Sequence, residues 1–184
     1  MIALRELQEK DAELMLEWMH DSDIQKGFKK KMTEMSLEDA KEFIKSAKIP
    51  KRIVNGDNIH YGIVNTSDDI YLGTISLKDI DLENRNAEYA ITLRKCAQGK
   101  GIASIATGLI LKKAFFELDL GRVFLSVYAD NISAIRLYER SGFTLEGEFR
   151  NHFRINGRGI NWKWYGMLKE EYDENIFRIN ADII

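Results

Sequence analysis

Residues 98–103 read Gln98-Gly99-Lys100-Gly101-Ile102-Ala103, and the chain changes character on either side of them. Before them, residues 87–93 are rich in Ile, Tyr and Thr, which favours a strand. After them, apolar residues recur at helical spacing to about Leu118, and Gly121 is expected to close this helix as its C′ residue. The stretch therefore predicts a strand, a glycine-rich turn and a long helix in direct succession.

The glycines of this stretch indicate a loop that binds an anion. Glycine lets the backbone turn tightly and approach a ligand closely, and the first amides of the following helix have no partner inside the helix. These amides and the helix dipole favour a phosphate or a pyrophosphate. A plain loop before a glycine-rich helix start is the alternative. Ser104 occupies the place of the third glycine of G-x-G-x-x-G, and no P-loop string occurs, so a nucleotide-binding module is supported by the loop alone.

Outward from this stretch, strand and helix patterns follow one another along the chain. Expected strands cover residues 2–7, 60–65, 71–80, 87–93, 123–129, 143–153 and 160–168, and expected helices cover 11–20, 36–48, 102–118 and 132–140. Ser36 to Asp39 forms a capping box, and Asn156-Gly157 is a hairpin turn dipeptide. The order β-α-α-β-β-β-α-β-α-β-β predicts the α+β class, with a mixed, mostly antiparallel central sheet flanked by helices.

Composition excludes several classes of protein. The 184 residues carry a formal charge of −2, which argues against a nucleic acid partner. Apolar runs are far shorter than the roughly 20 residues that cross a bilayer, and the first residues contain no apolar signal core, so we expect a cytoplasmic protein with no membrane partner. The single cysteine, Cys96, agrees with a reducing compartment. Three scattered histidines and one cysteine give no zinc spacing, so no metal is expected.

No linker divides the chain, so we expect one domain over residues 1–172. Residues 173–184 form a tail with several apolar residues, which is expected to dock on its own domain or on a second subunit of a homodimer.

A second motif extends from Asn131 to Phe143 and follows a predicted strand. Asn131 is placed to cap the next helix. Tyr138 lies seven residues further on, two helical turns along nearly the same face, so the two side chains can line one groove. A tyrosine that only fills the core is the alternative.

Together the two motifs resemble the GCN5-related N-acetyltransferase (GNAT) superfamily. Its pyrophosphate loop, Q/R-x-x-G-x-G/A, is matched by Gln98, Gly101 and Ala103. Its later signature, N-x-x-A-x-x-L-Y-x-x-x-G-F, is matched by Asn131, Ala134, Leu137, Tyr138, Gly142 and Phe143. The resemblance covers about residues 2–172 and is strongest to the branch of ribosomal-protein N-terminal and spermidine acetyltransferases. It implies the GNAT fold for this acetyltransferase domain.

The resemblance also implies a co-substrate and roles for individual residues. The co-substrate is acetyl-CoA, with contacts from Ile91, Thr92, Leu93, Gln98, Gly99, Lys100, Gly101, Ile102, Ala103, Ser104 and Asn131. Tyr138 matches the general acid that protonates the departing thiolate. Glu88 is the candidate base for the amine, with a solvent-facing strand residue as the alternative. Cys96 lies beside the loop, but the family transfers its acyl group without a cysteinyl intermediate.

The implied activity is N-acetylation of a primary amine, such as an N-terminal amine or a polyamine, by direct attack in a ternary complex. The acceptor, a small molecule or a peptide, is expected to contact Trp18, Asp21, Phe28 and His152. Lys29 to Lys31 and the segment around Trp18 leave open an amino-sugar nucleotide of surface-glycan synthesis. A non-catalytic CoA-binding module is a further alternative.

Overall fold

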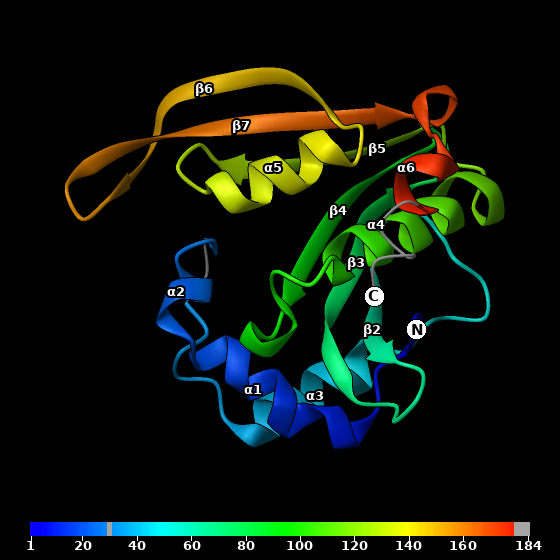
Figure 1. Cartoon of the computed structure of the whole chain (residues 1–184), viewed down its shortest axis with the longest axis vertical. Helices are drawn as coiled ribbons and strands as arrows, with labels where there is room; N and C mark the ends of the chain where they lie inside the picture. Colours follow the sequence, from blue (N-terminus) through cyan, green and yellow to red (C-terminus); the bar gives the residue numbers. More distant parts are fainter. Residues whose placement is uncertain (29–30, 179–184) are drawn as a thin grey trace.

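The computed structural model describes residues 1–28 and 31–178, which are built around one seven-stranded sheet (Figure 1). The strands lie in the order β1-β2-β3-β4-β5-β7-β6. Only β4 and β5 pair in parallel; the other neighbours are antiparallel. Their bounds are β1 Ile2–Glu6, β2 Ile59–Asn65, β3 Tyr71–Asp81, β4 Asn86–Leu93, β5 Arg122–Tyr128, β6 Thr144–Ile155 and β7 Arg158–Leu168. The predicted α+β class with a mixed, mostly antiparallel sheet is confirmed.

The helices follow the expected order, with two short additions. They are α1 Ala12–His20, α2 Ser22–Gln25, α3 Leu37–Ser46, α4 Ile102–Lys112, α5 Ile132–Arg140 and α6 Glu174–Arg178. Short 3-10 turns occupy Glu9–Asp11, Lys95–Ala97 and Lys169–Glu171. Ser36 caps α3, and the side chain of Asp39 accepts from the Ser36 amide, so the predicted capping box is present.

Helices cover the two faces of the sheet. Tyr89 and Leu77 point toward α4, since the Tyr89 hydroxyl bonds to Thr107 of that helix. His60 is on the other face, where its ring meets Phe43 of α3. Alternate strand residues point to opposite faces, so each side of the sheet buries its own apolar set. Each large aliphatic side chain buried in this way contributes about 1.5–3 kcal/mol.

The end of α4 differs from the expectation. The α-helix stops at Lys112 and continues as a π-helical turn over Lys113–Glu117. The left-handed residue that follows is Asp119, with φ 52°, and not Gly121. Asp tolerates this conformation, and Gly121 instead donates its amide to the carbonyl of Arg85 at 2.7 Å. The predicted C′ role of Gly121 is therefore wrong.

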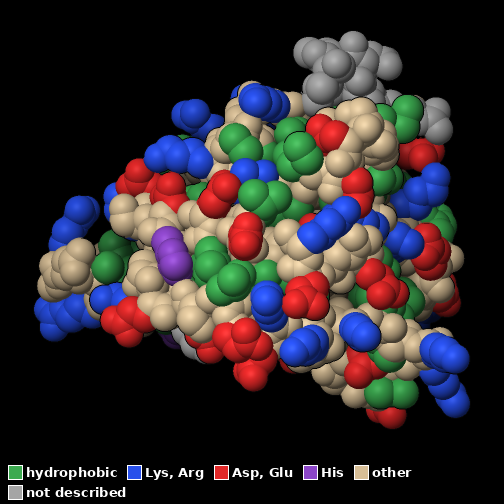
Figure 2. Space-filling model, turned by 90° about the horizontal axis from the view of Figure 1, so that it is seen from below, with side chains coloured by type: hydrophobic (Ala, Val, Ile, Leu, Met, Phe, Trp, Pro, Cys, Tyr) green, Lys and Arg blue, Asp and Glu red, His purple; other side chains and the backbone are tan. Residues whose placement is uncertain are grey.

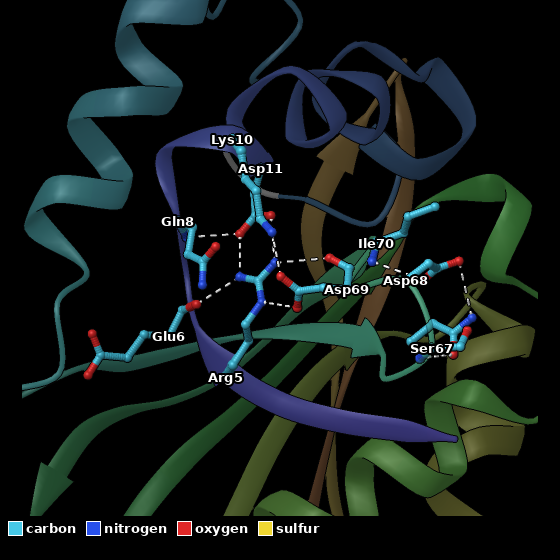
Figure 3. A network of polar contacts seen from close by, with 10 residues as sticks. Arg5, Glu6, Gln8, Lys10, Asp11, Ser67, Asp68, Asp69 and Ile70 are labelled. Atoms are coloured by element: carbon cyan, nitrogen blue, oxygen red, sulfur yellow. Dashed lines mark hydrogen bonds and ion pairs between the residues drawn. The ribbon is translucent and has the colours of Figure 1, made fainter.

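A partly buried ion network fixes the N-terminal strand (Figure 3). Arg5 donates to Asp11 at 2.7 and 2.8 Å and to Asp69 at 2.7 Å. Lys10 also pairs with Asp69. Asp11 is only 1% exposed, so its charge is stable there because two guanidinium N–H groups face it. The network ties β1 to the turn between β2 and β3.

The β6–β7 hairpin forms one border of the sheet. Its turn residues Asn156 and Gly157 have φ 49° and 76°, as a tight hairpin turn with two left-handed residues requires. β6 pairs only with β7, and its register shifts between Leu145 and Gly147 and again between Phe149 and Phe153. Asn151, inside the second shift, has φ 51°. The outer strand is therefore bulged and not flat.

The described part of the tail packs on its own domain. Phe177 of α6 is 6% exposed and lies against Gly108 of α4. A Cβ added at Gly108 would lie 2.6 Å from the Phe177 ring, so only glycine leaves room for it. Residues 179–184, the rest of the expected tail, lie outside the described residues.

Candidate functional site

The centre of the site is the point where β4 and β5 separate. They pair over three residues, Asn86 with Arg122, Ala87 with Val123 and Glu88 with Phe124. Beyond Glu88, β4 pairs with no described strand on this side, and β4 and β5 diverge (Figure 1). Ile91, Thr92 and Leu93 still pair with β3 on the other side. The edge of β4 that faces β5 therefore offers backbone groups to a ligand along the three residues that are predicted to contact acetyl-CoA.

The predicted anion loop follows directly from this open edge. Gly99 and Gly101 have φ 72° and 73°, the left-handed conformation that glycine adopts without strain. Gly101 is the N-cap of α4. Within the described part of the chain, the amides of residues 99–103 make no hydrogen bond, and a Cβ at Gly99 would meet nothing within 4 Å. The loop and the first turn of α4 thus form an open cradle of free N–H groups, which suits a diphosphate.

Gln98 has a supporting place in this loop. Its side-chain amide donates to the carbonyl of Leu93 at 3.2 Å, across the Lys95–Ala97 turn. It therefore holds the end of β4 to the start of the loop. Lys100 and Ser104 lie on the same loop and first helical turn, and Lys100 is exposed.

Asn131 lies across the separation, at the N-terminus of α5. Its Oδ1 accepts the Ala134 amide at 3.2 Å and the Ser133 hydroxyl at 3.1 Å. Its Nδ2 faces Gly27, where an added Cβ would come within 3.2 Å. The segment after α2 therefore lies close to the start of α5, and the cap uses only one end of the Asn131 amide.

Tyr138 comes from the buried side of α5 and is 8% exposed. Three aromatic rings surround it: Tyr89 at 5.9 Å and 89°, Phe143 at 6.1 Å and Tyr165 at 6.3 Å between ring centroids. No described residue bonds to its hydroxyl, which leaves its proton available to a ligand. Burial raises the pKa of Tyr138 well above the usual value of a phenol, so the hydroxyl stays protonated at neutral pH.

Glu88 is the last residue of β4 that pairs with β5, and it points to the sheet face opposite Tyr89. Its Oε2 lies 2.9 Å from Nζ of Lys78, its cross-strand partner on β3. Both side chains are partly exposed, at 25% for Glu88 and 33% for Lys78. Tyr138 packs with Tyr89, so the carboxylate and the phenol are on opposite sides of the sheet, beside the same opening.

Of the four predicted acceptor contacts, Trp18 and Phe28 touch each other, whereas His152 belongs to a different aromatic group. Trp18 is buried, donates its indole N–H to the Tyr71 hydroxyl at 2.9 Å and stacks on Phe28. Asp21 caps α2 by accepting the amides of Asp23 and Ile24. These hydrogen bonds, that of Ile24 first, lower the pKa of Asp21. His152 is exposed on β6 and stacks on Trp162. Trp18 therefore packs inside the helical layer, and His152 belongs to a separate aromatic group on the hairpin.

Sequence reasoning missed Lys78 and Tyr89. Lys78 lies opposite Glu88 because the antiparallel register of β3 and β4 is continuous from Gly73–Leu93 to Lys78–Glu88. Once one pair of this hairpin is known, counting along the two strands gives the others. The sequence signal that could have identified Tyr89 is weaker. Tyr89 is an aromatic residue with a hydroxyl on a face of β4 that is otherwise apolar.

One face of the molecule carries charges of both signs. Figure 2 shows Lys and Arg interspersed with Asp and Glu over the face seen from below. Among residues 1–28 and 31–178, no group of three His, Cys, Asp or Glu is arranged to hold a metal ion. None of the described helices is long and apolar enough to cross a membrane.

Comparisons with known proteins agree with this geometry. A family model described as an acetyltransferase (GNAT) domain matches residues 2–144. The uncharacterized N-acetyltransferase p20 of Bacillus licheniformis is 28% identical over 93% of this chain and 94% of its own. The putative ribosomal N-acetyltransferase YdaF of Bacillus subtilis is 36% identical over 55% of each chain, so this match spans about half of that relative. The crystal structure of spermidine N-acetyltransferase from Vibrio cholerae in complex with CoA and spermine superposes with a TM-score of 0.80, at 25% identity, over 93% of this chain and 97% of that one.

Proposed function

Because the chain belongs to the acetyltransferase (GNAT) family, we propose that it transfers the acetyl group of acetyl-CoA to a primary amine by direct attack in a ternary complex. The observation that carries the proposal is the separation of β4 from β5 beside the free amides of residues 99–103. This arrangement supplies an anion cradle, an open strand edge and the Tyr138 phenol around one opening.

Each part of the opening suits one part of the co-substrate. The amides of the loop and of the first turn of α4 would hold the diphosphate, with Lys100 adding charge and Gln98 bracing the loop. The open edge over Ile91, Thr92 and Leu93 would hold the amide-bearing pantetheine arm and polarise the thioester carbonyl. The free Nδ2 of Asn131 would donate to the same arm from the opposite side.

Acetyl-CoA supplies an acetyl group on a sulfur leaving group. In the proposed reaction the amine nitrogen attacks the carbonyl carbon, the C–S bond breaks, and the electron pair leaves on sulfur. The Tyr138 hydroxyl, which its raised pKa keeps protonated, donates its proton as negative charge develops on the sulfur. The Glu88 carboxylate accepts the proton that the ammonium loses before attack, directly or through water, and Lys78 orients it. The nitrogen loses a second proton as the amide forms, and an equivalent proton restores the Tyr138 hydroxyl.

Four carboxylates of α1, α2 and β4 are paired with cations, which favours an acceptor with a single positive charge, such as the N-terminal amine of a peptide. Glu17 pairs with Arg94, and Glu88 pairs with Lys78. Asp21 lies 3.7 Å from Lys95, and Asp23 pairs with Lys26. A polyamine carries several charges and needs carboxylates that are not already neutralised. A polyamine remains the second candidate, because the similar Vibrio cholerae structure contains spermine.

An acceptor panel tests the proposal. The purified protein is incubated with acetyl-CoA and, separately, with unblocked peptides, spermidine, amino acids and an amino-sugar nucleotide. The acetylated amine is measured by mass spectrometry, because the exposed thiol of Cys96 would itself react with a thiol reagent. We expect acetylation of peptide N-termini in preference to spermidine.

The other outcomes separate the alternatives. Tight coenzyme A binding with no product from any amine would support a non-catalytic CoA-binding module. Preferential binding of ATP or NAD would support a nucleotide-binding module. Acetylation of the amino-sugar nucleotide alone would move the acceptor to the surface-glycan class, whose sequence support, Lys29 to Lys31, lies mostly outside the described residues.

A further inference from the structure

A buried hydrogen-bond chain joins β4 to the first turn of α4. The Tyr89 hydroxyl lies 2.8 Å from Oγ1 of Thr107, and that hydroxyl lies 2.7 Å from the carbonyl oxygen of Ala103. Tyr89 is 2% exposed and Thr107 is fully buried. Thr107 has one hydroxyl proton, which goes to Ala103, so Tyr89 is the donor in the first bond. Burial raises the pKa of Tyr89 well above the usual value, in agreement with a permanent donor.

The same tyrosine packs against the proposed general acid. The Tyr89 and Tyr138 rings meet edge to face, at 5.9 Å and 89°. Since no described residue bonds to the Tyr138 hydroxyl, packing alone sets the direction of that ring. Of the three rings around it, Phe143 has no polar atom and Tyr165 donates to Glu139 at the surface. Of these three rings, Tyr89 is the one that hydrogen-bonds to α4.

The hydrogen-bonded hydroxyls of Tyr89 and Thr107 are not needed for the stability of the fold alone. Two buried hydroxyls that satisfy each other can be replaced by apolar groups of the same shape with almost no loss of stability. The pair does fix one rotational position of the Tyr89 ring relative to Ala103. Ala103 belongs to the helical turn whose free amides form the anion cradle.

We propose that Tyr89 is a positioning residue, which couples the seating of coenzyme A on the first turn of α4 to the placement of the Tyr138 hydroxyl. Tyr89 does not touch the reacting atoms. A shift of Ala103 is passed through Thr107 to the Tyr89 ring, and from this ring to Tyr138. The inference rests on the proposed acetyltransfer and on the acid role of Tyr138.

The kinetic test uses acetyl-CoA with an unblocked peptide, and with spermidine if the peptide is not a substrate. Tyr89→Phe keeps the ring and removes the donor, so we expect kcat to fall about tenfold while KM for acetyl-CoA changes less than about twofold. Thr107→Ser keeps the hydroxyl and retains kcat. The double variant Tyr89→Phe/Thr107→Val removes the whole pair without an orphan, so it keeps its Tm but loses kcat as Tyr89→Phe does.

A second background isolates the route through Tyr138. Tyr138→Phe lowers kcat, and adding Tyr89→Phe to it then lowers kcat no further, because the group that Tyr89 positions is gone. If Tyr89→Phe lowers kcat by the same factor in the Tyr138→Phe variant as in the wild type, the positioning role is wrong. It is also wrong if Tyr89→Phe leaves kcat unchanged in both. If Tyr138→Phe alone leaves kcat unchanged, the acid role and the positioning role both fall.

A spectroscopic arm needs no acceptor and remains decisive if no amine is acetylated. Fluorotyrosine is incorporated, and the Tyr138 fluorine signal is assigned by its absence from Tyr138→Phe. ADP, which carries a diphosphate without the pantetheine arm that reaches Tyr138, is expected to shift this signal in the wild type and to shift it much less in Tyr89→Phe. Equal shifts would overturn the coupling, whereas failure of the amine panel alone would overturn only the acetyltransfer.

Discussion

Lys78 and Glu88 show what one residue pair adds to a site. They face each other across the β3–β4 hairpin with 2.9 Å between Nζ and Oε2, at the last rung before β4 leaves β5. A partly exposed pair of this kind contributes only about 0–1 kcal/mol to stability. The pair therefore serves to orient the carboxylate more than to hold the sheet together.

Replacing Glu88 by Gln removes the proposed base and keeps the shape of the side chain. We expect kcat/KM for the amine to fall about 100-fold at pH 7, which is the range of general-base catalysis. Steady-state kinetics over pH 6–9 measure the loss, and a higher pH should restore part of it because more of the free amine is already unprotonated.

The matched control for this variant is Lys78→Gln, which breaks the ion pair but keeps the carboxylate. Its loss of kcat/KM should be much smaller. Equal losses in the two variants would show that the pair acts through structure and would remove Glu88 from the role of base.

The loop before α4 belongs to the scale of the element, because its function depends on backbone conformation. Gly99→Ala places a Cβ at φ 72° without any clash. The left-handed conformation costs a non-glycine residue about 1–2 kcal/mol, so the binding-competent loop should become about tenfold less populated. Titration calorimetry with coenzyme A should show a Kd about tenfold higher.

Gly56→Ala is the matched control for this backbone effect. Gly56 also has positive φ, 87°, and open space around its Cβ position. It lies between α3 and β2, away from the loop, so the same strain should leave the Kd for coenzyme A unchanged. A Gly99→Ala variant that binds as tightly as wild type would contradict the proposed cradle.

Most elements could be predicted because their signals are local. The Ser36 capping box and the Asn156-Gly157 turn act within four residues, and the period change at Gly99 marks the start of α4. The separation of β4 from β5 has no such signal, since it depends on pairing between strands that a long helix keeps apart. The π-helical end of α4 and the docking of Phe177 on Gly108 are likewise products of packing.

The site was predicted unevenly for the same reason. The loop glycines and Asn131 lie in contiguous motifs, and the structure places them on two sides of one opening. The resemblance implies Trp18 and His152 as acceptor contacts because they lie in the first helix and the last hairpin, but their surroundings come from tertiary contacts with Tyr71 and Trp162. The residues next to a side chain in the sequence do not determine which residues it contacts in the folded core.

At the scale of the whole molecule, buried tyrosines set the alkaline limit of stability. Burial raises the pKa of Tyr71, Tyr89 and Tyr138 in the folded protein, whereas in the unfolded chain a tyrosine titrates near 10. Below pH 10 both states keep their protons and stability is full. Above pH 10 the unfolded chain releases protons that the folded protein retains, so the free energy of unfolding should fall by about 1.4 kcal/mol per tyrosine per pH unit.

Urea unfolding at pH 9, 10 and 11 measures this loss. The double variant Tyr89→Phe/Thr107→Val lacks one of these phenols, so above pH 10 its free energy of unfolding should fall by about 1.4 kcal/mol less per pH unit than that of the wild type. Lysine titration affects both proteins equally. An identical pH dependence in the two proteins would show that Tyr89 ionises as easily when folded as when unfolded.

The bulged outer strand β6 has a consequence for how copies of the molecule behave at high concentration. A long border strand with free peptide groups is a template on which another chain can extend the sheet. The two register shifts and the left-handed Asn151 interrupt that template, and Arg150 and Arg154 place charge along it. Straightening β6, for instance by deleting Asn151, would leave an uninterrupted edge strand on which other chains could add strands and form cross-β aggregates.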